Sequence, residues 1–403
     1  MASDDLRREP ASQGSARVIE DLAGRRPEMT AWRRQLHARP ELAFREHGTA
    51  EFLGRMLGGF GIDVHPGLAG TGVVGTLRRG SGRRGIALRA DMDGLPLQEA
   101  SEVPHRSQVP GAMHACGHDG HMAMLLGAAR YLAESGRFDG TVHFVFQPAE
   151  ENEGGGRVMV EEGLFDRFPA EAVFGLHNWP GLPPGHIAVR PGPVMAAFDV
   201  FEVVVRGRGA HGAMPHLAVD PVVAAAQMIG AFQTIVSRNV SPVEAAVVSV
   251  TQVQGGETWN VIPEEVRLRG STRYFLPGVG RVVEDGVRRV AAGVAAAFGA
   301  TATVEYRRRY PATVNTAAEA EVAARVAADV AGGAAVHRDL PPSLVSEDFA
   351  FLLQARPGCY ACIGNGPDEE GRGLHSPRYD FNDDILPVGA AYWVRLAETV
   401  LSS

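Results

Sequence analysis

The order of strand-like and helix-like segments is the feature that most constrains how this chain can fold. Apolar residues recur at helical spacing in some stretches and form short strand-like runs in others. Helical spacing covers residues 30–37, 48–57 and 121–133, and strand-like runs cover 73–77, 85–89, 141–147 and 172–176. Alternation of this kind predicts an α/β layer with a mostly parallel sheet. Because such sheets bind ligands at strand ends, we expect the chemistry there.

A different pattern begins after Pro191-Gly192-Pro193. Strands at 199–205, 244–252, 265–274 and 301–307 and helices at 220–238 and 280–298 give the order β-α-β-β-α-β of a ferredoxin-like fold. The α/β pattern then returns, with helices at 317–330, from Ser346 and at 387–401, and a strand at 359–363. We therefore predict an inserted α+β domain at residues 194–308. The first domain is then discontinuous and consists of residues 1–193 and 309–403.

Composition excludes several classes of chemistry. All 39 basic residues are arginine, so the chain has no Walker A lysine, no kinase lysine and no lysine for a Schiff base. The net charge of −8 argues against a nucleic-acid partner. No apolar run is long enough for a membrane span, and residues 1–26 are too polar for a secretory signal. Three cysteines are too few for a disulfide framework, so we expect a cytoplasmic protein.

The string from His114 to His121 packs three histidines, a cysteine and an aspartate into eight residues. Borderline metals bind thiolate and imidazole together, so Cys116 and His118 are candidate ligands. The alternative is a polar loop with a buried cysteine. The surrounding sequence favours the metal.

Further candidate ligands follow other strand-like runs. Glu150 and Glu151 follow residues 141–147, His177 follows residues 172–176, and His375 lies in the returning tail. Adjacent glutamates on a solvated turn are common, but metal-assisted hydrolysis needs one carboxylate on the metal and another that takes a proton from water. Structural zinc fingers draw their ligands from short paired spacings, whereas these ligands come from four separate loops. The pattern favours a catalytic site with two metal ions.

With these motifs the chain resembles the M20 family of metallo-amidohydrolases, in the branch of hippurate hydrolases, N-acyl-amino-acid amidohydrolases and auxin-conjugate hydrolases. The matching strings lie at residues 34–37, 40–41, 88–93, 113–121, 147–151, 175–180, 209–215, 260–263, 346–349 and 374–383. The resemblance implies a zinc-peptidase-like catalytic domain and an inserted domain that serves as a lid and in dimerisation.

The resemblance also implies roles for the candidate ligands. Cys116 matches a bridging thiolate, His118 and His177 match the ligands of one metal, and Glu151 and His375 match those of the other. Glu150 matches the general base of the family. Asp91, Asp93, His114 and His121 are expected to orient these ligands. For Asp91 and Asp93 there is an equal alternative, namely that they are ordinary exposed carboxylates at the ends of strands.

Three further residues lie in the inserted domain. The string from Gly207 to Gly212 fits G-x-G-x-x-G, but Pro215 interrupts it and no helix follows at once, so we reject a dinucleotide site. In the family this segment carries a histidine, matching His211, that reaches the active site of a partner subunit. Asn260 and Arg273 match contacts to the substrate carboxylate, although an exposed strand arginine is an alternative reading of Arg273.

The expected reaction is metal-dependent hydrolysis of N-acyl amino acids, aroyl or fatty-acyl, by a homodimer. Two divalent ions are expected, and the ligand set admits zinc, manganese, cobalt or nickel. The alternatives are a dipeptidase or aminopeptidase on the same scaffold, and a metal-bound protein without catalysis. An intact Glu150 argues against the last.

Cys359 and Cys362 would point to opposite faces of a strand, which favours core packing over redox chemistry.

Overall fold

The computed structural model describes residues 13–368 and 371–402, so the first twelve residues of the polar N-terminal segment lie outside it. The chain divides into two compact units. Unit 1 comprises Met1–Val194, Val314–Pro341 and Asp348–Ser403, and unit 2 comprises Met195–Thr313 and Pro342–Glu347. No helix in the described ranges combines the length and apolarity needed to cross a bilayer.

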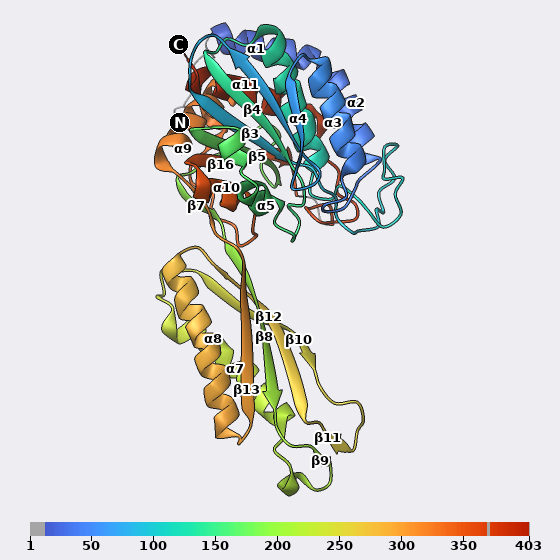
Figure 1. The fold of residues 1–403 in the computed structure, drawn as a ribbon, viewed down its shortest axis with the longest axis vertical. Helices are drawn as coiled ribbons and strands as arrows, with labels where there is room; N and C mark the ends of the chain where they lie inside the picture. Colours follow the sequence, from blue (N-terminus) through green and yellow to red (C-terminus); the bar gives the residue numbers. More distant parts are fainter. Residues whose placement is uncertain (1–12, 369–370, 403) are drawn as a thin grey trace, which may run out of the picture. The chain divides into compact units, whose positions relative to one another are not determined.

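Unit 1 is built on an eight-stranded sheet with the order β1-β2-β4-β3-β5-β16-β6-β15 (Figure 1). The strands are β1 (Asp63–Leu68), β2 (Gly72–Arg79), β3 (Gly85–Asp91), β4 (Gly140–Gln147), β5 (Ala172–Pro180), β6 (Ile187–Ala188), β15 (Val336–His337) and β16 (Gly358–Gly366). Within the central run β4-β3-β5-β16, each strand is parallel to the next. Antiparallel pairing joins β1 to β2, β2 to β4 and β16 to β6. The predicted α/β fold with a mostly parallel sheet is confirmed.

Helices cover both faces of this sheet. One layer contains α1 (Gln13–Gly24), α2 (Arg26–His37), α4 (His118–Ser135), α9 (Ala317–Ala331) and α11 (Leu386–Val400), and α3 (His47–Gly59) packs beside it on β1 and β2. On the other side α5 (Gly155–Glu161) and α10 (Phe349–Ala355) pack together, next to the short α6 (Leu164–Arg167). Phe174 and Leu176 of β5 enter the main core, whereas Gly175 between them faces Tyr360 and Phe349. This alternation places the two helical layers on opposite faces.

Unit 2 is a four-stranded antiparallel sheet with the order β10-β12-β8-β13 and two helices on one face (Figure 1). Its elements in chain order are β8 (Ala197–Arg206), α7 (Pro221–Thr234), β10 (Ala246–Gln254), β12 (Glu265–Tyr274), α8 (Pro277–Ala297) and β13 (Thr301–Tyr310). This is the β-α-β-β-α-β order. Buried residues alternate along β12 because its other face is open.

The limits of unit 2 lie a few residues from the boundaries of 194 and 308 derived from the sequence. β13 continues to Tyr310, which is buried. Pro342–Glu347 also belongs to this unit, because the backbone N–H of Ala196 donates to the carbonyls of Ser343 and Val345. A contact between segments so distant in the chain leaves no periodic signal in the sequence.

Candidate metal centre

The candidate ligands of unit 1 gather where the central strands end. Asp91 ends β3, and Glu150 and Glu151 lie in the turn after β4. His177 lies near the end of β5, and His118 begins α4. Parallel strands bring these carboxyl ends to one edge of the sheet. The sequence order of the elements therefore produces the convergence.

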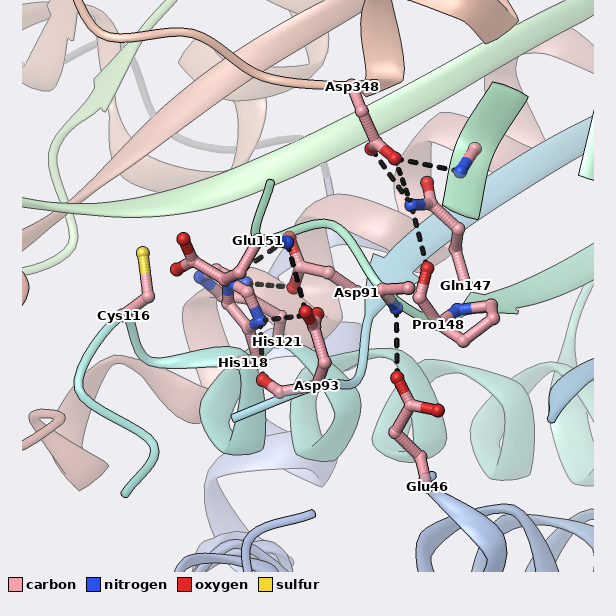
Figure 2. A network of polar contacts seen from close by, with 12 residues as sticks. Glu46, Asp91, Asp93, Cys116, His118, His121, Gln147, Pro148, Glu151 and Asp348 are labelled. Atoms are coloured by element: carbon pink, nitrogen blue, oxygen red, sulfur yellow. Dashed lines mark hydrogen bonds and ion pairs between the residues drawn. The ribbon is translucent and has the colours of Figure 1, made fainter. Parts of the chain in front are cut away.

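The structure brings together all five residues that the sequence marked as ligands. Donor atoms of Cys116, His118 and Glu151 lie within 4.8 Å of one another, and Figure 2 shows their side chains side by side. His177 Nε2 lies 3.4 Å from Cys116 Sγ. His375 Nε2 lies 3.0 Å from Glu151 Oε1. Thiolate, imidazole and carboxylate are the donors that borderline divalent ions bind, so this set fits such a metal.

The histidines of this cluster are oriented as metal ligands are. His118 Nδ1 donates to the backbone oxygen of Asp93 at 2.8 Å, while its buried Nε2 makes no hydrogen bond to any described residue. His177 Nδ1 donates to the backbone oxygen of Asn178 at 2.6 Å. In metal sites the second ring nitrogen of a ligand histidine is held by a carbonyl or carboxylate in this way. Nε2 of both histidines is therefore the nitrogen presented to the cluster.

The local field favours positive charge. Burial opposes protonation of His118, but the charges of Asp91 and Asp93 outweigh burial and raise its pKa to about 10. Glu151 adds to the same field. Carboxylates that stabilise a proton on His118 would stabilise a divalent cation at the same place. The electrostatics therefore agree with the donor set.

His121 lies beside the cluster, with a ring nitrogen within 4.8 Å of donor atoms of His118 and His177, and its hydrogen bonds indicate a supporting role. Its Nδ1 donates to Asp91 Oδ1 at 2.6 Å, and its Nε2 accepts from the backbone N–H of Asn178 at 2.9 Å. Both ring nitrogens are thus engaged, as expected for an orienting residue. His114 is buried and forms no side-chain hydrogen bond within the described ranges, so no contact supports an orienting role for it. Burial lowers the pKa of His114 to about 4.

The turn after β4 separates the two adjacent glutamates. Ala149 has a positive φ of 55°, and its backbone N–H donates to Glu46 Oε1 at 2.9 Å. The backbone N–H of Glu151 donates to Asp93 Oδ2 at 3.0 Å. The carboxylate of Glu151 joins the cysteine cluster, whereas that of Glu150 belongs to a different acidic group with Asp348. Neighbours in sequence thus have distinct environments.

In unit 2, His211 and Asn260 are neighbours across a small hairpin. β9 (Ala210–His211) pairs with β11 (Val261–Ile262), and the backbone N–H of Gly212 donates to the carbonyl of Asn260. The N–H of Ala213 donates to His211 Nδ1 at 3.1 Å, so Nε2 carries the proton of the neutral ring. The glycine-rich string leads into this hairpin and not directly into a helix, so the segment lacks the helix N-terminus on which a dinucleotide fingerprint depends.

Arg273 lies at the other end of β12, away from this hairpin. Its guanidinium lies 4.1 Å from the ring centroid of Phe198 and donates to Ser346 Oγ, and it forms no ion pair with any described carboxylate. Burial lowers its pKa. It lines a hollow of about 510 Å³ on the open face of the sheet. Glu265, which begins β12 near Asn260, is eight residues from Arg273, or roughly 26 Å along a strand. Asn260 and Arg273 of one chain therefore cannot bind the same carboxylate.

Sequence reasoning gave no role to several residues that support the cluster. Arg89 is fully buried and binds Asp91, Gln147 and Asp348. Asn178 contacts the backbone of Cys116. A buried arginine within a strand-like run was the one available signal, because such a charge requires partners.

Comparison with known proteins identifies the family of the chain. Residues 87–399 match the model of Peptidase family M20/M25/M40. An N-acetylcysteine deacetylase of Bacillus subtilis is 39% identical over 374 residues, which span 92% of this chain and 96% of the relative. A hippurate hydrolase of Campylobacter jejuni is 39% identical over 379 residues, which span 94% of this chain and 97% of that relative. A Bacillus subtilis structure described as a dinuclear metal-binding peptidase is 35% identical, with a TM-score of 0.82. The match covers 95% of this chain and 99% of the chain in that structure.

Proposed function

The chain belongs to peptidase family M20/M25/M40, and we propose that it hydrolyses the amide bond of N-acyl amino acids to a carboxylate and a free amino acid. The observation that carries this proposal is the convergence of Cys116, His118, Glu151, His177 and His375 at one edge of the sheet. Two relatives that span nearly the whole chain support the substrate class, since hippurate and N-acetylcysteine are both N-acyl amino acids.

Five residues would hold two divalent ions. Cys116 would bridge them, His118 and His177 would bind one, and Glu151 and His375 would bind the other. When bound, the ions supply Lewis acidity, which polarises the scissile carbonyl and lowers the pKa of a water molecule. The ligand set is compatible with zinc, manganese, cobalt and nickel.

Glu150 is the proposed general base. Its carboxylate would take a proton from the attacking water and return that proton to the leaving amine nitrogen. Glu150 is not among the donors that gather with Cys116 and His118, which is compatible with a base that is not itself a ligand of this centre. The buried position of Glu150 also keeps bulk water away from the proton transfer.

The substrate contacts of unit 2 suggest a homodimer. His211 presents Nε2–H, which would donate to the scissile carbonyl, and Arg273 and Asn260 would bind the free carboxylate of the substrate. Since Asn260 and Arg273 of one chain lie too far apart, the site would take His211 and Asn260 from one subunit and Arg273 from the other. The three cysteines are buried and form no disulfide bond, which suits a reducing compartment, and we place the dimer in the cytoplasm.

Metal analysis of the purified protein, together with a hydrolysis screen, tests the proposal. The screen compares N-acetyl-, N-benzoyl- and long-chain N-acyl amino acids with dipeptides that carry a free amine. We expect two divalent ions per chain and metal-dependent release of free amino acids from the acylated substrates. Faster cleavage of the dipeptides would indicate a dipeptidase or aminopeptidase and overturn the proposal.

A further inference from the structure

Asn178 is a fully buried residue whose four polar groups all contact the metal centre or its supports. It follows the candidate ligand His177 in β5 and has no exposed surface. Its backbone carbonyl accepts from His177 Nδ1 at 2.6 Å, and its backbone N–H donates to His121 Nε2 at 2.9 Å. The main chain of Asn178 therefore sets which nitrogen of His177 faces the cluster.

The side chain of Asn178 connects two other segments. Its Nδ2 donates to the backbone oxygen of Cys116 at 2.7 Å, and its Oδ1 accepts from the hydroxyl of Tyr379 at 2.6 Å. Tyr379 is also fully buried. The two contacts fix the amide orientation, because a flipped amide would place oxygen against the carbonyl of Cys116. The Cys116 carbonyl, which can only accept, thus determines that Nδ2 faces the cysteine loop, and the hydroxyl of Tyr379 holds the other end of the amide through Oδ1.

The fit around the cysteine loop is close. Gly117 has φ of 92°, and a β-carbon at this position would lie 2.3 Å from Asn178 Nδ2 and 2.6 Å from the Tyr379 hydroxyl oxygen. The segment that carries Tyr379 is also tied to this loop, since the backbone N–H of His375 donates to the carbonyl of Ala115 at 2.8 Å. The Cys116 loop is therefore held by Asn178 from β5 and by Tyr379 from the C-terminal segment.

From these contacts we propose that Tyr379 and Asn178 are positioning residues that hold the thiol of Cys116 in place relative to His177, so that both bind metal in one fixed geometry. In this role the pair acts through hydrogen bonds to the ring of His177 and to the backbone of Cys116. The inference rests on the proposed metal-binding role of Cys116. Loss of partners behind metal ligands typically weakens metal binding about 10- to 100-fold.

The test uses Co²⁺ as a spectroscopic probe in Tyr379→Phe, Asn178→Ala and the double variant. Tyr392→Phe is the matched control, because Tyr392 is equally buried and its hydroxyl has no hydrogen-bond partner among the described residues. Competition with a chelator gives the Co²⁺ affinity, and the thiolate-to-Co²⁺ charge-transfer absorption reports the bond to Cys116. We expect about 10- to 100-fold weaker Co²⁺ binding and a weaker or shifted absorption for Tyr379→Phe and Asn178→Ala, and no change for the control.

The double variant tests whether the two residues act as one unit. In the Asn178→Ala background, Tyr379→Phe should have no further effect, because its only proposed route to Cys116 is gone. Equal effects of Tyr379→Phe in both backgrounds, or wild-type affinity and absorption in folded Tyr379→Phe, would overturn the inference. Thermal unfolding of the metal-free variants shows whether they fold. If the unmodified protein bound metal without thiolate absorption, the proposed role of Cys116 would fail instead.

Discussion

Glu150 and Glu151 are adjacent in sequence, yet their carboxylates belong to different clusters. We predict that Glu150→Gln keeps both metals and loses about 10²- to 10⁴-fold in kcat, as expected for loss of a general base. Glu151→Gln should instead lose metal, because an amide is a poorer ligand than a carboxylate. Metal content and kcat are measured for both variants. Equal metal loss in the two would show that the roles are not separate.

A second residue-scale prediction concerns Arg273, whose guanidinium pairs with no described carboxylate and is therefore available to an anionic substrate. N-acyl amino acids should be cleaved about 10- to 200-fold faster than their amidated analogues, because an amide leaves the arginine without its charged partner. Arg273→Ala should remove most of that preference in kcat/KM. Arg269→Ala is the matched control, since Arg269 on the same strand already binds Glu202. Equal cleavage of both substrate types by the unmodified enzyme would contradict the carboxylate contact.

At the scale of single elements, Asp220 caps the N-terminus of α7, where the sequence predicted a helix from residue 220. Its side chain accepts from the backbone N–H of Val222 at 2.8 Å and of Val223 at 3.3 Å, and Pro221 occupies the first helical turn. Asp220→Ala should destabilise unit 2 by about 0.5 to 2 kcal/mol, whereas Asp220→Asn should retain the cap. Urea unfolding followed by a probe in unit 2 measures the difference. Equal losses for the alanine and asparagine variants would mean that capping is not the cause.

Elements with strong periodicity were predictable and short ones were not. β12 occupies residues 265–274, as expected, because apolar and polar residues alternate along its half-exposed length. β6 and β15 have two residues each, too few for any period to show. α1 was missed because its surrounding segment is polar, although Val18 and Leu22 are spaced as one helical face and are buried. Cys359 and Cys362 lie in separate apolar clusters, as the strand argument predicted.

The same limit applies to the metal centre. Strand ends indicated where Glu150, Glu151 and His177 would gather, since a parallel sheet brings those ends together. Tyr379 contacts Asn178 across 201 positions of the chain, and no local pattern marks such a pair. Residues that present donors, and supports close to them in the chain such as Asp91 and His121, could thus be anticipated, whereas the pair of Asn178 and Tyr379 required coordinates.

At the scale of the molecule, a buried ionic network joins α2 to α4 and to the loop after β3. His37 Nδ1 lies 2.9 Å from Asp119 Oδ2, and its Nε2 lies 3.3 Å from Glu99 Oε1. Burial opposes the charged ring, but the charge of Asp119 and hydrogen bonds to both carboxylates outweigh it and raise the pKa of His37 from 6.5 to about 9. When folding raises the pKa of a histidine, its protonation stabilises the native state. This contribution to stability is complete at pH values below the pKa of the unfolded state, and it is lost as the pH rises through the pKa of the folded state.

We therefore expect the stability advantage of the wild type over His37→Gln to be greatest below pH 6.5 and to shrink as pH rises through about 9. The rise from 6.5 to about 9 corresponds to about 3.4 kcal/mol at most. Urea unfolding of both proteins across this range measures the difference, with the exposed His216→Gln as the control. A difference that grew with pH would have the wrong sign and would show that His37 is neutral in the folded protein.

The proposed dimer gives a prediction that no single chain can satisfy. His211 lies in unit 2, whereas every proposed metal ligand lies in unit 1, and Asn260 and Arg273 cannot reach one carboxylate within a chain. His211→Ala and Glu150→Gln should each be nearly inactive, but a hybrid of the two contains one complete site if His211 acts on the partner. Random exchange should restore about a quarter of wild-type activity, because half of the dimers are hybrids and each hybrid has one of its two sites intact. Mixing Glu150→Gln with itself gives the baseline, and His216→Ala, a neighbouring exposed histidine, should remain active alone. No recovery after verified subunit exchange would place His211 in the site of its own chain or outside any site.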